Sequence, residues 1–132
     1  MRDNAFHRLI QIMATLRSPE GCPWDREQTP ESLIPYLAEE ACEVIEALTG
    51  DDPDAICEEL GDLLLQVVFL ARIFEERGSF SIEDVVTSIN QKLERRHPHV
   101  FGDHPTIHCP DEQSILWDKI KQQEKLNKKS PR

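Results

Sequence analysis

Two acidic turns lie inside segments whose other residues are largely apolar. The first, EExxE, occupies residues 39–43, and the second, ExxD, occupies residues 59–62. Side chains three or four residues apart share one face of a helix, so each turn groups its carboxylates. Carboxylate oxygen is a hard ligand, and a cluster of Asp and Glu alone favours Mg²⁺ or Mn²⁺ over zinc or copper. Because protein-bound Mg²⁺ usually shares its coordination shell with substrate phosphates, the pattern indicates phosphate chemistry.

A helical projection turns four of these acids toward the apolar side. At about 100° per residue, Glu40 lies within the apolar arc of its helix, Glu43 lies at the edge of that arc, and Glu39 lies further round. Asp62 is in line with the apolar residues of its own helix, and Glu59 precedes it by one turn. An unpaired carboxylate in a core costs several kcal/mol or becomes protonated. We therefore expect a cation to compensate the four inward-facing acids.

An exposed helix surface is the alternative interpretation of the acidic turns. Glutamate pairs at helical spacing are common on solvated faces, and this explains the EExxE turn on its own. The second turn favours the cation site, because it lies in the most hydrophobic segment of the chain, residues 57–76. The remaining acids of these helices are assigned to solvated faces: Glu31, Glu46, Glu58, Glu75 and Glu76.

Helical periodicity runs through most of the chain and must position these acids. Apolar residues recur at spacings of three and four, and turn residues separate the periodic segments. We expect helices over residues 3–17, 30–50, 54–77 and 82–97, then a polar stretch over 102–110 and a last helix from 111 that frays into a basic tail over 120–132. Thr29 and Ser81 are typical N-cap residues, and Ser81 with Asp84 is close to a capping box.

The expected architecture is all-α. No segment alternates as a strand does, so we expect a helical bundle of four to five helices in a single domain over residues 1–132. The segment from Leu60 to Phe74 is apolar almost all round. Its helix is therefore expected to be the most buried element.

The chain is acidic, and its acidity is concentrated. The 132 residues carry a formal net charge of −10, and residues 25–62 hold thirteen acids against one base, Arg26. Nucleic-acid polymers are bound through clustered Lys and Arg, so we expect no such polymer as a partner. An acidic segment of this density either stays in water or gathers cations.

The sequence favours a cytoplasmic protein with no membrane association. The first residues do not resemble a signal peptide, and Arg72 interrupts the longest apolar run before it reaches the length of a membrane span. The four cysteines form no CxxC pair, and two of them lie in apolar helical segments, where a free thiol behaves as a small hydrophobic group. A reducing compartment fits this usage best.

Five motifs are spread along nearly the whole chain, between residues 16 and 125: LRSPEGCPWDREQTPESL, EEACEVIEAL, EELGDLLLQVVF, KLERRHPHVFGD and WDKIKQQEK. Together they resemble the single-domain form of the MazG family of nucleoside triphosphate pyrophosphohydrolases, within the all-α NTP pyrophosphatase superfamily. The resemblance implies Mg²⁺ ligands at four positions, with Mn²⁺ as a possible substitute. These ligands are Glu40, Glu43, Glu59 and Asp62. Glu39 and Glu40 are the implied catalytic residues, and Glu39 or another spare carboxylate is expected to orient or deprotonate the attacking water.

The resemblance also implies substrate-binding residues outside the acidic turns. Lys92, Arg95 and Arg96 correspond to the basic residues that the family uses against the triphosphate. Exposed charges are the alternative, since Lys92 and Arg96 share a helix face at i,i+4. Trp117 is expected to stack on the nucleobase, with Lys121 at the same end, and a core or interface tryptophan is the alternative.

The segment GCPWDREQT is a further signature of the family. Trp24, Asp25 and Gln28 are expected to line the substrate pocket, and a packed loop anchored by Trp24 explains the same residues. Leu70 is a departure, because many relatives have His there, and we do not expect this position to touch the metal ligands.

The implied activity is Mg²⁺-dependent hydrolysis of nucleoside triphosphates between the α and β phosphates, which yields a monophosphate and pyrophosphate. Removal of aberrant nucleotides is one role that fits this activity. A small helical subunit is expected to complete its bundle by pairing, as a homodimer or a dimer of dimers. The alternative function is a catalytically weak nucleotide-binding regulator with the same fold.

Two other metal sites compete with this interpretation. A ferritin-like di-iron bundle normally requires ExxH turns, and both acidic turns here lack His. A zinc site would draw on the donors that crowd the region after the fourth helix, but their spacing matches no finger pattern. These donors are His97, His99, His104, His108 and Cys109.

Overall fold

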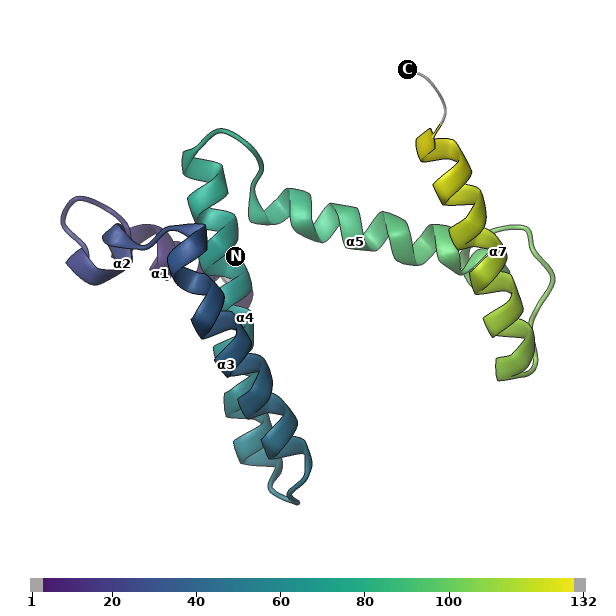
Figure 1. Cartoon of the computed structure of the whole chain (residues 1–132), viewed down its shortest axis with the longest axis horizontal. Coiled ribbons are helices and arrows are strands. Elements are labelled where there is room, and N and C mark those ends of the chain that lie inside the picture. The colour runs from purple at the N-terminus through teal and green to yellow at the C-terminus, as the bar shows by residue number, and fades with distance from the viewer. Residues whose placement is uncertain (1–3, 130–132) are drawn as a thin grey trace. The chain divides into compact units, whose positions relative to one another are not determined.

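The structure is a computed structural model that describes residues 4–129, and within this range the chain forms helices and no strand (Figure 1). The helices are α1 (Ala5–Leu16), α2 (Pro23–Glu27), α3 (Pro30–Leu48), α4 (Pro53–Glu76), α5 (Ile82–Arg96), α6 (Pro98–Phe101) and α7 (Pro110–Lys129). The predicted all-α class is confirmed. The five long helices correspond to the predicted ones, whereas α2 and α6 are not among them.

Prolines account for the two short helices. Pro23 and Pro98 each occupy the first helical position, where the missing amide hydrogen is not needed. Both segments lie outside the helices expected from the sequence. In the structure, each of these prolines starts a single turn of helix.

Both predicted N-caps are confirmed. The Thr29 hydroxyl accepts a hydrogen bond from the Ser32 amide at 3.1 Å, and the Ser32 hydroxyl accepts one from the Thr29 amide at 2.9 Å. At α5, the Asp84 carboxylate accepts from the Ser81 amide at 2.9 Å, and the Ser81 hydroxyl accepts from the Asp84 amide at 3.3 Å. Reciprocal capping of this kind fixes where α3 and α5 begin.

The chain divides into two compact units, residues 1–85 and residues 86–132, and each is described by itself. In the first unit, α3 and α4 form a helical hairpin joined by residues 49–52, and α1 packs against α4. The core of this unit consists of Met13, Leu33, Val68, Phe69, Ala71, Ile73 and Ile82. The α4 members of this core all come from the second half of the helix, so the ExxD turn lies outside the core. The expectation of one domain over residues 1–132 stays a prediction.

Within residues 4–129, α4 supplies most of the buried side chains, as expected for the most buried element. Its apolar residues are nonetheless not covered on every side, because Leu60, Leu64 and Val67 are 50%, 40% and 38% exposed. A two-helix hairpin covers only one face of each helix, and this leaves the opposite apolar stripe open. Within residues 4–129, no helix is both long and apolar enough to cross a membrane.

Candidate metal site

Four carboxylates converge between the two helices of the hairpin. Glu40 and Glu43 project from α3, and Glu59 and Asp62 project from α4. One oxygen from each carboxylate lies within 4.8 Å of one oxygen of every other, and all four side chains are half-buried. The hairpin produces this geometry because it brings the two acidic turns to the same level on facing helices. We call these four residues the acidic cluster.

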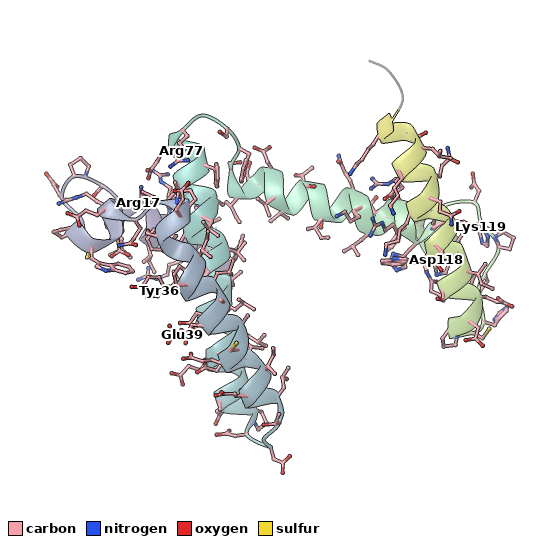
Figure 2. All side chains as sticks on the ribbon, in the orientation of Figure 1. Arg17, Tyr36, Glu39, Arg77, Asp118 and Lys119 are labelled. Atoms are coloured by element: carbon pink, nitrogen blue, oxygen red, sulfur yellow. The ribbon has the colours of Figure 1, made fainter. Side chains whose placement is uncertain are left out.

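Glu39 lies outside the acidic cluster. It belongs to α3 and is labelled in Figure 2, and its side chain is exposed. Its charge still reaches the cluster, because it is one of the acids that raise the pKa of Glu40. The structure therefore separates the first Glu of the EExxE turn from the second and third, as the helical projection predicts.

The acidic cluster is electrostatically unsatisfied. Within residues 4–129, no ion pair joins its members to a basic side chain, and one buried oxygen on each of Glu40 and Glu59 has no hydrogen-bond partner. A shared hydrogen bond with the Glu43 carboxyl, burial and the neighbouring negative charges raise the pKa of Glu59 to about 6. Burial, followed by the proximity of Glu43 and Asp62, raises the pKa of Glu40.

A hard divalent cation fits this donor set. Each carboxylate offers an oxygen, two of these residues carry a buried oxygen that lacks a partner, and the four charges repel one another. Mg²⁺ binds through a few carboxylates and keeps several waters, which suits a half-buried site at the side of a hairpin. No His or Cys belongs to the cluster, so the soft and borderline ligands that zinc and iron favour are missing from it.

The histidine-rich region does not assemble a second site of this kind. Within the described part of the chain, the acidic cluster is the one place where three or more His, Cys, Asp or Glu donors converge in metal-binding geometry. The rings of His97 and His99 lie 5.7 Å apart and are tilted, and His104 interacts with the Pro105 carbonyl. The zinc alternative therefore gains no support from the structure.

The segment that carries Trp24, Asp25 and Gln28 consists of α2 and its C-cap residue, and it packs against α3 and α4 of the first unit. Trp24 is exposed on one side and packs edge-on against Tyr36 at 5.7 Å and Phe69 at 6.4 Å. The Gln28 amide donates to the Trp24 carbonyl at 3.0 Å, and its side-chain oxygen accepts from the Ser32 hydroxyl. The Gln28 side chain thus makes its hydrogen bonds to α2 and to the start of α3, whereas part of the Trp24 side chain remains open to solvent.

Arg17 binds the end of α2 and is absent from the sequence predictions. Its guanidinium donates to the backbone carbonyls of Asp25 and Gln28, forms a pair with Glu76 at 2.8 Å and lies over the Phe69 ring. Glu76 is exposed, as assigned, but hydrogen bonds from Arg17 and then from Arg72 lower its pKa. The two partners are 59 residues apart, so no local spacing signals this pair.

The remaining predicted substrate residues belong to the second unit. Arg95 and Arg96, at the end of α5, both pair with Glu124 on α7, at 2.7 Å and 2.9 Å. The Arg96 guanidinium also lies over the Trp117 ring, 5.3 Å from its centroid. Lys92 is half-buried on α5, and Lys121 is exposed on α7. Sequence reasoning did not single out Glu124.

A basic hollow of about 490 Å³ lies along α7 in this unit. The residues that line it are Arg96, Asp118, Lys121, Gln122, Glu124, Lys125 and Lys128. Asp118, one of its acidic members, is labelled in Figure 2. The hollow brings Arg96 and Lys121 together from different helices.

A helical hairpin with four convergent carboxylates defines an all-α protein with a candidate cation site. Residues 28–101 match the MazG nucleotide pyrophosphohydrolase domain, which is more than half of the chain, and the protein belongs to this family. The match contains the whole acidic cluster and the cations of α5, but it excludes α7 and Trp24.

Named relatives extend the similarity over most of the chain. The chain is 58% identical over 127 residues to the nucleoside triphosphate pyrophosphohydrolase/pyrophosphatase MazG of Thermotoga maritima, which covers 96% of this chain and 48% of the relative. It is 47% identical over 126 residues to the nucleoside triphosphate pyrophosphohydrolase of Escherichia coli, with 95% and 48% covered. The chain thus spans about half the length of these curated relatives.

A solved structure shares the fold. The crystal structure of a mazG-related protein from Thermotoga maritima superposes with a TM-score of 0.71 at 28% identity. The superposition covers 87% of this chain and 97% of that one.

Proposed function

We propose that this chain is an enzyme that hydrolyses nucleoside triphosphates between the α and β phosphates and releases a nucleoside monophosphate and pyrophosphate. The observation that carries the proposal is the acidic cluster, whose converging carboxylates have no basic partner in the described part of the chain. Membership of the MazG family and the names of relatives at 47–58% identity support the substrate class.

The ligands proposed for Mg²⁺ or Mn²⁺ are Glu40, Glu43, Glu59 and Asp62. When bound, such an ion neutralises phosphate oxygens and acidifies a water molecule. Glu39, exposed beside the cluster, is proposed to orient the attacking water and accept its proton. The water oxygen forms a bond to the phosphorus of one of the two phosphates, α or β. At the same time, the bond from that phosphorus to the oxygen that bridges the two phosphates breaks, and the other phosphate leaves with the bridging oxygen.

Cationic and aromatic residues are proposed to hold the rest of the substrate. Lys92, Arg95 and Arg96 supply positive charge for the phosphate oxygens, and guanidinium groups suit this task because they donate hydrogen bonds in a planar fork. Trp117 and Lys121 are proposed for the nucleobase end. Trp24, which is partly exposed, is proposed to line the pocket together with Asp25. Gln28 is proposed to stabilise α2, which carries both residues, through its hydrogen bond to the Trp24 carbonyl.

Pairing of two or more copies is part of the proposal. Besides the open stripe of α4, three apolar side chains of α3 are at least 60% exposed, namely Ile34, Ile45 and Leu48. Apolar stripes along both helices of a hairpin match the surface that a second hairpin would cover to complete a four-helix arrangement. We propose a homodimer or a dimer of dimers. Glu in place of Ile45 should lower the mass measured by light scattering if this surface forms the interface, and an unchanged mass would contradict it.

The cellular setting is proposed from the same features. The cysteines Cys22, Cys42, Cys57 and Cys109 are all unpaired, which fits a reducing cytoplasm. Removal of aberrant nucleotides is proposed as the role, because the enzyme would convert a polymerase substrate into a monophosphate that polymerases do not use.

A product assay tests the proposal. Purified protein is incubated with Mg²⁺ and a panel of ordinary, deoxy and damaged nucleoside triphosphates, and pyrophosphate and monophosphate are quantified. We expect equal amounts of both products, and we expect Glu40→Gln to abolish their release while Glu46→Gln, an exposed acid of the same helix, retains it. Nucleotide binding without turnover by the wild-type protein would favour the regulator, and release of inorganic phosphate alone would exclude cleavage between the α and β phosphates.

A further inference from the structure

Two adjacent arginines of the second unit converge on one carboxylate. Arg95 donates from Nε to Oε2 of Glu124 at 2.7 Å, and Arg96 donates from Nη2 to Oε1 at 2.9 Å and from Nε to Oε2 at 3.4 Å. Neighbouring residues of a helix point about 100° apart and do not normally face each other. Glu124 therefore draws together two guanidinium groups that the helix itself would separate.

Glu124 also binds Arg96 at the place where the Arg96 guanidinium lies over an aromatic ring. The carboxylate binds one edge of the guanidinium, through Nε and Nη2, while the Trp117 ring lies against the group at 5.3 Å. His97 packs edge-on against the same ring at 5.4 Å. The side chains of Arg96 and Glu124 are only 17% and 18% exposed, so this arrangement is held between helices and does not depend on a loose surface contact.

The Glu124 carboxylate remains charged across the ordinary pH range. Hydrogen bonds from Arg96 and then from Arg95 lower the pKa of Glu124 to about 2, and the same carboxylate raises the pKa of Arg96. One negative charge is thus shared by two positive charges, and the group retains a net positive charge.

Donors remain available on this group. Arg95 uses only Nε in its contact with Glu124, and its side chain is half exposed, so its terminal nitrogens can reach another acceptor. Arg96 faces the basic hollow, which also contains Lys121, Lys125 and Lys128. A chain of phosphates needs donors of this kind at fixed spacing.

We propose that Glu124 is the positioning residue of the phosphate-binding arginines, because it binds the guanidinium groups of both Arg95 and Arg96 and holds that of Arg96 over the Trp117 ring. The inference rests on the proposed function and assigns a role to a residue of α7 that does not itself touch the substrate. The competing explanation is a structural ion pair between α5 and α7 with no effect on the ligand.

Binding of inorganic tripolyphosphate in the presence of EDTA separates these explanations without any turnover. Calorimetry is run on the wild-type protein and on Glu124→Asp, Glu124→Gln and Glu124→Ala, with Glu94→Gln as the control for loss of one exposed acid on α5. We expect Glu124→Ala to weaken the affinity about tenfold, the size of one charge-assisted hydrogen bond, although the variant is more positively charged. Glu124→Asp should retain more affinity than Glu124→Gln, and Glu94→Gln should match the wild type.

Steady-state kinetics provide the second readout. Loss of ligand positioning should raise KM for a nucleoside triphosphate about tenfold in Glu124→Ala and leave kcat within about twofold, because the lost contacts act on ground state and transition state alike. Circular dichroism of Glu124→Asp and Glu124→Gln checks that the helices persist.

Unchanged or tighter tripolyphosphate binding in all three Glu124 variants would overturn the inference. A loss of tripolyphosphate affinity in Glu94→Gln as large as in the Glu124 variants would also overturn it. Absence of pyrophosphate release by the wild-type protein would instead refute the proposed function, even if tripolyphosphate binding depends on Glu124.

Discussion

The two units of this chain hold half-buried carboxylates in opposite electrostatic situations. In the acidic cluster of the first unit, four carboxylates converge, and a hydrogen bond with Glu43, burial and repulsion raise the pKa of Glu59 to about 6. In the second unit, Arg95 and Arg96 surround Glu124 and lower its pKa to about 2. A carboxylate with partners in the fold is already satisfied, whereas a group of carboxylates without partners requires a ligand. The same comparison separates a site that should bind a cation from one that should help to bind an anion.

The largest expected effect comes from removing a single charge in the acidic cluster. Asp62→Asn or Glu59→Gln should reduce Mg²⁺-dependent pyrophosphate release more than about 100-fold, because a bound metal contributes several kcal/mol to stabilising the transition state. Glu58→Gln is the matched control, since this exposed neighbour lies outside the cluster. The measurement is initial rate at saturating nucleotide. If Glu58→Gln lost as much of the initial rate as the cluster variants do, acids of the cluster could not be distinguished from acids of the surface.

A smaller effect should follow from pH and cation together. The pKa of Glu59 is raised from 4.5 to about 6, so the folded state holds its proton more tightly than the unfolded state does. The stability that this provides is present below about pH 4.5 and is lost as the pH rises through about 6. Mg²⁺ should therefore raise the melting temperature in EDTA-treated protein more at pH 7.5 than at pH 5.

Calorimetric melting with and without Mg²⁺ checks this second prediction. The control is Glu59→Gln. In this variant, the Mg²⁺-induced rise in melting temperature should differ less between pH 7.5 and pH 5 than it does in the wild type. A Mg²⁺-induced rise in melting temperature that is larger at pH 5 than at pH 7.5 would contradict the proposed ligand set.

The opposite pH dependence is expected for the second unit. The pKa of Glu124 is lowered, so its contribution to stability is present above about pH 4.5 and is lost as the pH falls toward about 2. The difference in melting temperature between wild type and Glu124→Gln should be nearly constant from pH 5 to pH 8 and should decrease only in acid. If that difference instead grew as the pH fell below 4.5, the assigned ion pairs would be wrong.

The smallest effect is expected from Arg95. Its side chain is half exposed and pairs with Glu124 through one nitrogen, whereas Arg96 is shielded and also lies against Trp117. Replacing Arg95 with Ala should lower the melting temperature less than replacing Arg96, because exposed ion pairs contribute little. Thermal melts monitored by circular dichroism measure both variants. Equal decreases in melting temperature would show that the contact of Arg96 with the Trp117 ring does not stabilise the fold.

Much of the fold follows from local rules and was therefore predictable. Caps such as Thr29 with Ser32, and helix ends at glycine such as Gly78, which has a φ of 76°, depend on residues close together in sequence. The convergence of Glu40 with Asp62 was also predictable, because helical period fixes the face of each side chain and a short turn forces the two helices to pack together.

Pairs between distant side chains were not predictable in the same way. Arg17 with Glu76, and Arg96 with Glu124, join residues 59 and 28 positions apart through long flexible side chains that leave no periodic pattern. The exposure of Leu60 and Leu64 was missed for a related reason. An apolar residue carries the same sequence signal whether it faces its own core or a surface that another chain would cover.

The most direct test of the central claim is cation binding in the absence of nucleotide. Mn²⁺ is titrated into the wild-type protein, and free Mn²⁺ is followed by electron paramagnetic resonance, with Mg²⁺ added as a competitor. The same titration is run on Glu40→Gln, Asp62→Asn and Glu124→Gln. We predict saturable binding that Mg²⁺ displaces, that weakens at least about tenfold in the two cluster variants, and that is unchanged in Glu124→Gln. Equal Mn²⁺ affinity in the wild type and the two cluster variants would contradict the account.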